Sequence, residues 1–193
     1  MEQALERLGF QRCPEEKHRL EETITALENN RGYRYEVRDA RRLEGRSPVY
    51  YYVKIRHGGV DDQAVAEEEI LFPLRRPSAS GLVLVVKPST LAPGPARLLG
   101  LLATGAWDAQ PDDLQKLELP PDLQGTNLAG ALAPAGARLY DLVDASTLSV
   151  VQGLGDAGGM LVRFRDGWCS VAAASAQLPF QIEQLVARIR PLL

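Results

Sequence analysis

Two stretches of the chain alternate large apolar or aromatic residues with charged ones. In residues 33–38 (YRYEVR) every second side chain is a tyrosine or a valine, and residues 49–56 (VYYYVKIR) repeat the pattern after a loop that contains Gly45. Because successive side chains of a strand point to opposite faces, a period of two is typical of a strand and incompatible with a helix. We therefore predict that residues 33–39 and 49–56 pair as an antiparallel hairpin.

The same alternation predicts which side chains of the second strand face the core. The residues expected to face inward are Val49, Tyr51, Val53 and Ile55. Those expected to face outward are Tyr50, Tyr52, Lys54 and Arg56. The partner strand is expected to add Arg34 and Arg38 to this outer face, which would then combine two exposed aromatic rings with four cations.

Periodicity and turn residues predict the other elements. We expect helices in residues 1–9, in a segment that begins at Pro14, in a Leu-rich segment from Pro95 to Gly105, from Pro111 through Leu117, and from Pro179 to the C-terminus. We expect strands in residues 66–74, 81–87, 160–165 and 168–173, with the last two joined by a tight Asp166-Gly167 turn. Residues 137–151 fit a helix or a strand equally well.

This order of elements predicts an α+β fold with a largely antiparallel sheet, N-terminal helices, a central Pro-rich helical segment and a C-terminal hairpin followed by a helix. We expect a helix-plus-sheet lobe in residues 1–105, a Pro-rich connector in residues 106–136 and a hairpin-plus-helix lobe in residues 137–193. The first and last lobes could share one core, because 193 residues suffice for one domain or two small lobes.

Composition excludes several classes of protein. The N-terminus lacks a basic region followed by an apolar run, and no apolar run approaches the length of a membrane span, so we expect a cytoplasmic protein without a membrane segment. Two cysteines far apart in the sequence are expected to be free thiols, and two histidines are too few for a histidine-based zinc site. No serine or cysteine has a histidine at a diagnostic spacing. We therefore expect no catalytic residue, no bound metal and no cofactor.

Basic charge is concentrated in one place. The net charge is −3, yet residues 31–57 carry eight arginine or lysine side chains against three carboxylates. Exposed aromatic rings among cations are typical of proteins that bind single-stranded nucleic acids, because bases stack on the rings and phosphates pair with the cations. The candidate nucleic-acid-binding residues are Arg34, Arg38, Arg41, Arg42, Arg46, Tyr50, Tyr52, Lys54 and Arg56. A solvated sheet face with cross-strand pairs explains the same pattern equally simply.

Two other motifs are weaker. Residues 153–158 (GLGDAG) match G-x-G-x-x-G, but a strand is expected to follow them where dinucleotide binding requires a helix, so we interpret them as a loop. Glu67, Glu69 and the nearby Asp62 could supply Mg²⁺ ligands for a nuclease. Only Glu67 and Glu69 would share a strand face, and we expect no metal there.

The sequence therefore supports three functional hypotheses. The first is a non-enzymatic protein that binds single-stranded or structured RNA or DNA through the hairpin face. The second is a protein-interaction or assembly factor that docks through the Leu-rich helix at 95–104 and the C-terminal helix. In that case the basic hairpin would meet an acidic partner protein or the acidic lobe of a second copy. The third is a metal-dependent nuclease.

Overall fold

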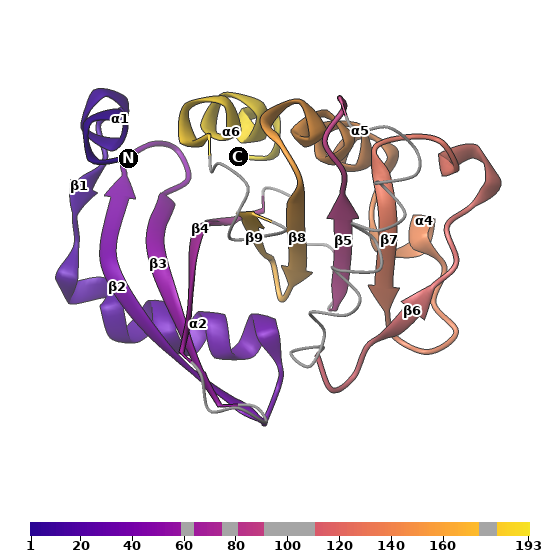
Figure 1. Cartoon of the computed structure of the whole chain (residues 1–193), viewed down its shortest axis with the longest axis horizontal. Coiled ribbons are helices and arrows are strands. Elements are labelled where there is room, and N and C mark those ends of the chain that lie inside the picture. Colours follow the sequence, from indigo (N-terminus) through magenta and orange to yellow (C-terminus); the bar gives the residue numbers. More distant parts are fainter. Residues whose placement is uncertain (59–63, 75–80, 91–110, 174–180) are drawn as a thin grey trace.

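A single antiparallel sheet organises the molecule (Figure 1). The computed structural model describes residues 1–58, 64–74, 81–90, 111–173 and 181–193. The nine strands found there have the order β1-β2-β3-β4-β9-β8-β5-β7-β6, so the α+β prediction with a largely antiparallel sheet is confirmed. The strands are β1 (Gln11–Arg12), β2 (Tyr33–Leu43), β3 (Val49–Gly58), β4 (Val65–Pro73), β5 (Leu82–Val86), β6 (Gln115–Leu117), β7 (Leu128–Ala133), β8 (Met160–Arg165) and β9 (Trp168–Ala173).

Short helices cover the two faces of this sheet. They are α1 (Glu2–Leu8), α2 (Lys17–Glu28), α4 (Leu139–Leu142), α5 (Ala145–Gly153) and α6 (Ile182–Ile189), with short 3-10 turns η1 (Pro14–Glu16), η3 (Pro121–Leu123), η4 (Leu154–Ala157) and η5 (Arg190–Leu192). The helix α1 ends where Gly9 adopts a left-handed conformation that glycine tolerates best. None of the helices in the described ranges is long and apolar enough to cross a bilayer.

The larger core lies on the face covered by α1, α5 and α6. Apolar side chains of β4, β5, β8 and β9 pack there against the inner faces of these helices. The apolar stripe of α6 is fully used in this packing, since Leu185 and Ile189 are buried. The apolar stripe of α6 therefore contributes to the core of the protein.

A smaller core lies on the opposite face, beneath α2. Leu20, Ile24 and Leu27 of α2 pack there on aromatic residues of β2 and β3. The helix crosses the lower halves of these strands, whereas α1 and α6 lie at their upper ends (Figure 1). Consequently β2 and β3 are covered on different faces at their two ends.

Most local predictions are confirmed. The hairpin of β2 and β3 forms, and Asp166 and Gly167 both have positive φ in the turn between β8 and β9. The ambiguous residues 137–151 form α4 and most of α5. The predicted helix after Pro111 is wrong, because Leu114 closes a turn onto Pro111 and residues 115–117 then pair with β7.

Three further expectations concern other segments of the chain. The Leu-rich helix predicted from Pro95 lies outside the described residues. The strand β4 pairs with β9, so the N-terminal and C-terminal segments of the chain contribute to the same sheet. The G-x-G-x-x-G residues run from the end of α5 into the 3-10 turn η4, and the next element is the strand β8 rather than an α-helix.

Candidate functional site

The tyrosines of β3 are buried. Tyr52 is 0% exposed, and Tyr50 and Tyr51 are each 2% exposed. Tyr50 and Tyr52 contribute to the core beneath α2, whereas Tyr51 belongs to the core on the other face. The prediction that Tyr50 and Tyr52 are exposed is therefore wrong, because the apolar stripe of α2 packs on the face that alternation had assigned to solvent.

The predicted cations do not share a face. In the register of β2 and β3, Arg34 lies opposite His57 and Arg38 lies opposite Val53, whereas Lys54 lies opposite Val37. Because residues directly opposite in an antiparallel pair point to the same side, Arg34 and Arg38 lie on the face away from Tyr52 and Lys54. The expectation of a common outer face is wrong.

A β-bulge changes the register further along the hairpin. The pairing shifts between Arg38 and Arg41, where Asp39 adopts a φ of 48°. Beyond the bulge, Arg42 lies opposite Tyr50 on the α2 side, and its guanidinium carbon is 5.9 Å from the centre of that ring. The bulge thus divides the arginines of one strand between two faces.

Most of the hairpin cations have carboxylate partners within the chain. Arg38 Nε lies 2.9 Å from Glu36, and Arg42 pairs with Glu16 and Glu44. The Arg41 side chain is almost fully buried, with Glu2 at 3.1 Å and Asp39 at 3.0 Å. Arg34 and Arg46 are exposed, and Arg56 lies over the Tyr33 ring at 5.0 Å. The basic excess of residues 31–57 therefore does not form a continuous positive face.

Lys54 is the centre of a buried ionic cluster. Its ammonium donates a hydrogen bond to Glu28 of α2, and its Nζ lies 3.0 Å from Glu67 and 3.2 Å from Glu69 on the neighbouring strand β4. Arg163 of β8 completes the cluster, with its guanidinium 3.3 Å from both Glu28 and Glu69. The prediction that Lys54 faces solvent is therefore wrong, since Lys54 is 1% exposed.

The electrostatics of this cluster raise the pKa values of Lys54 and Arg163 and lower those of Glu28 and Glu67, so these four groups favour their charged forms. Burial alone would lower the pKa of Lys54, but the three carboxylates around it outweigh this effect and raise its pKa. Burial likewise disfavours ionised Glu67, yet Lys54 and Arg163 lower its pKa to about 2. An ammonium that stays protonated is neither a general base nor a nucleophile, so the geometry gives the cluster a structural role.

The arrangement also bears on the carboxylates that were considered as metal ligands. Glu67 and Glu69 do converge on one face of β4, but Lys54 Nζ occupies the space between them. Within the described ranges, no group of three or more histidine, cysteine, aspartate or glutamate side chains is arranged to hold a metal ion. Asp62 lies outside the described residues.

Sequence reasoning missed Glu28 and Arg163 as members of this cluster. Glu28 is the last residue of a helix, and Arg163 lies between Val162 and Phe164 in a largely apolar strand. A charged residue inside an apolar run indicates a buried ion pair, because an unpaired charge there would be costly. That signal was present for Arg163, but its partners come from α2 and β4 and could not be inferred from spacing.

One face of the lower part of the hairpin contributes to none of the apolar core clusters formed by the described residues. The side chains that point away from α2 along the lower halves of β2, β3 and β4 are Arg34, Glu36, Arg38, Val53, Ile55, His57, Ala66 and Glu68. We call this set the open face. Val53 and Ile55 form its centre; Val53 is partly exposed, whereas Ile55 is only 8% exposed. Figure 1 shows α1 and α6 at the upper ends of these strands, away from the lower halves that form this face.

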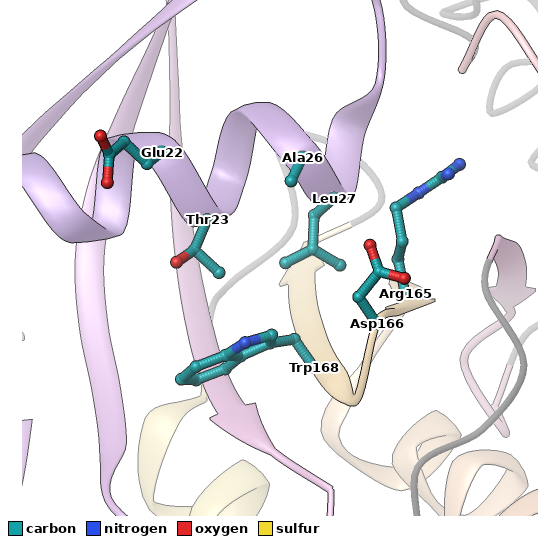
Figure 2. Close-up of a pocket in the computed structure, with 7 residues that line it drawn as sticks. All are labelled: Glu22, Thr23, Ala26, Leu27, Arg165, Asp166 and Trp168. Atoms are coloured by element: carbon teal, nitrogen blue, oxygen red, sulfur yellow. The ribbon is translucent and has the colours of Figure 1, made fainter.

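A pocket lies on the other side of the sheet, between α2 and the β8–β9 turn (Figure 2). Trp168 and Leu27 contribute its apolar lining, and Glu22 and Asp166 contribute carboxylates. The pocket has a volume of about 270 Å³. It contains none of the residues that the sequence had suggested as a binding site.

Comparisons with known proteins add no functional information. No protein-family model, curated protein or solved structure gives a significant match to this chain.

Proposed function

We propose that the protein is a non-catalytic interaction factor that binds a partner protein through the open face of β2, β3 and β4. The observation that carries this proposal is the position of Val53 and Ile55. The partly exposed Val53 and the buried Ile55 lie at the centre of a sheet face, outside the described core clusters, and charged residues surround them. An apolar centre with a polar rim is the usual arrangement of a protein–protein interface.

The charges of the open face suit a protein partner better than a polyanion. Glu36 accepts a hydrogen bond from Arg38 and lies 3.3 Å from His57, and Glu68 accepts one from the Tyr51 hydroxyl. Carboxylates and cations therefore alternate across the face. Nucleic-acid phosphates would meet repulsive carboxylates at two positions, whereas a protein surface can present complementary charges to both signs.

The nucleic-acid hypothesis loses its stacking residues. Base stacking requires exposed ring faces, and Tyr50 and Tyr52 are buried beneath α2. Lys54, which was expected to contact phosphate, is held by three glutamates. What remains of that hypothesis is a set of exposed arginines without an aromatic surface.

A photo-crosslinking experiment tests the proposal. A benzophenone amino acid at position 66, an exposed alanine of β4 directly opposite Ile55, should give a defined protein adduct in cells of the source organism. The same group at position 140, an exposed tyrosine of α4, should give none. The adduct at position 66 should disappear in Arg38→Glu and persist in Arg138→Glu. Both arginines are exposed and paired with a carboxylate, but Arg138 pairs with Asp141 of α4, outside the open face.

The outcomes separate the hypotheses. Absence of an adduct at position 66 in folded protein would refute the open-face proposal, and an adduct to the protein itself would identify a second copy as the partner. Fluorescence anisotropy with labelled single-stranded DNA, single-stranded RNA and duplex should show no binding that responds to Arg34→Ala. Salt-dependent binding that weakens in that variant would favour the nucleic-acid hypothesis instead.

A further inference from the structure

The pocket between α2 and the β8–β9 turn combines an aromatic ring with two carboxylates. Figure 2 shows the Trp168 ring beneath α2, with Asp166 to one side of it and Glu22 farther away on the helix. Leu27 and Ala26 add apolar lining from the helix. The pocket is open to solvent, and Trp168 is half-buried, so part of its ring is available to a ligand.

The ring is held in a fixed position. Trp168 lies at the start of β9, where it pairs with Arg165 across the turn and with Pro73 of β4. Its ring packs against the Tyr50 ring, with the two ring centres 6.5 Å apart and an angle of 50° between the planes. A ring supported by strand pairing on both sides and by a buried neighbour needs little ordering when a ligand binds.

Two of the three charged side chains that line the pocket are carboxylates. Within the described part of the chain, the Asp166 carboxylate has no hydrogen-bond or ion-pair partner, and Glu22 contacts only the exposed His18, at 3.5 Å. The cation in the lining, Arg165, is bound through both terminal nitrogens to Asp113, at 2.7 and 2.9 Å. Figure 2 shows its guanidinium directed away from Trp168.

We propose that this pocket binds an arginine side chain of a partner protein. A guanidinium can stack flat on an indole ring, and its N–H donors can pair with the Asp166 carboxylate beside the ring, while Glu22 adds negative charge to the pocket from farther along α2. Its apolar stem would lie against Leu27 and Ala26. An acidic ligand would meet Glu22 and Asp166, and a purely apolar one would leave both carboxylates without a partner.

The arginine pocket and the open face lie on opposite sides of the sheet. Trp168 and Tyr50 face α2, whereas Val53 and Ile55 face away from it. Binding at one surface does not require the other. Evidence against binding at the open face would therefore not contradict the arginine pocket, and evidence against the arginine pocket would not contradict the open face.

Nuclear magnetic resonance of the Trp168 indole N–H tests the assignment. The chain contains a second tryptophan, Trp107, so the Trp107→Phe variant assigns the two indole signals. Titration with N-acetyl-arginine methylamide should shift the Trp168 signal in a saturable way at millimolar concentrations. N-acetyl-citrulline methylamide, which has the same shape and no charge, should bind about tenfold more weakly.

A charge-removing variant provides the matched control. In Glu22→Gln combined with Asp166→Asn, the preference for arginine over citrulline should fall to about twofold or less. Asparagine tolerates the positive φ of 50° at position 166, so the turn should be retained. If the double variant does not fold, Glu22→Gln alone should show a smaller loss in the same direction.

Three results would overturn the proposal. The first is no saturable shift of the Trp168 signal with the arginine probe. The second is equal affinity for arginine and citrulline in the unmodified protein, which would show that the carboxylates do not contribute. The third is tighter binding of N-acetyl-lysine methylamide, which would contradict the assignment to a guanidinium.

Discussion

The Glu21 carboxylate of α2 accepts a hydrogen bond from the backbone N–H of Val37 at 3.0 Å. Val37 lies on β2, and β1 pairs only with Arg41 and Arg42 of that strand. A helix side chain therefore satisfies a donor on the outer edge of the sheet where no strand is present. Lys17 adds a second link across the same edge, since its Nζ lies 3.9 Å from Glu36, whose side chain belongs to the open face.

Removal of this link should expose the edge of β2. We expect Glu21→Ala to lower the free energy of unfolding by about 1 kcal/mol, because the Val37 N–H loses its partner. We also expect it to cause concentration-dependent self-association, since an unpaired edge can pair with another chain. Urea denaturation and sedimentation velocity would measure the two effects. The exposed Glu15→Ala is the control and should change neither, and a monomeric Glu21→Ala of unchanged stability would contradict the prediction.

The Lys54 cluster should be sensitive to the loss of its central cation. Lys54→Met retains most of the side-chain volume but leaves Glu28 and Glu69 buried with one positive partner, Arg163. We expect this variant to lose about 3–5 kcal/mol of unfolding free energy, the usual effect of removing one partner of a buried ion pair. Lys116→Met, at an exposed position of β6, should cost less than about 0.5 kcal/mol. Chemical denaturation at pH 7 would compare them, and similar losses would show that the cluster is not structural.

The same cluster predicts how stability depends on pH. Lys54 and Arg163 hold the pKa of Glu67 at about 2 in the folded protein, below its ordinary value of 4.5. A carboxyl group with a depressed pKa stabilises the fold above its unfolded pKa, and this contribution disappears as the pH falls through the folded pKa. Stability should therefore decrease between about pH 4.5 and pH 2. The shift corresponds to an energy on the order of 3 kcal/mol.

Glu67→Gln separates this effect from general acid denaturation. The variant should be less stable than the unmodified protein at pH 7, because Lys54 loses one carboxylate. Its stability should then fall less steeply from pH 4.5 downward, since the ionisable group is gone. Urea midpoints recorded by circular dichroism between pH 5 and pH 2.5 would give both slopes. Parallel slopes would mean that Glu67 does not contribute to the acid sensitivity.

The sequence predicted where the strands lie better than which of their faces are covered by helices. The period of two in residues 33–38 and 49–56 determines a local backbone conformation, and the Asp166-Gly167 pair determines a tight turn, so both could be recognised. The pattern does not reveal whether a polar or aromatic face meets solvent or a helix. Here α2 covers the side of Tyr52 and Lys54, and the charges on that side are paired with residues from distant segments.

Two local irregularities also escaped prediction. The bulge near Asp39 moves Arg34 and Arg38 to a different face from Arg42, and a single extra residue of this kind is not marked by glycine or proline. After Pro111, the acidic residues and the spacing of Leu114 and Leu117 resemble the start of a helix. Pairing with β7 overrides that local helix preference, and this pairing could not be inferred from the local sequence.

Two tyrosines of the hairpin provide a final test of the packing. The Tyr35 hydroxyl is buried and has no hydrogen-bond partner in the described structure, whereas the Tyr51 hydroxyl donates a hydrogen bond of 2.7 Å to Glu68. A buried polar group without a partner lowers the stability of the fold, whereas a hydrogen bond to a charged group raises it. The same substitution should therefore have opposite effects at the two positions.

We expect Tyr35→Phe to raise the free energy of unfolding by about 1 kcal/mol, because it removes a desolvated hydroxyl and keeps the ring. Tyr51→Phe should lower it by about 1.5–3 kcal/mol, because the hydrogen bond to Glu68 is lost. Thermal and urea denaturation of the two variants, measured in parallel, would give both values. Destabilisation by Tyr35→Phe of the size expected for Tyr51→Phe would mean that the Tyr35 hydroxyl has a partner, most simply a buried water molecule bound beside the Lys54 cluster.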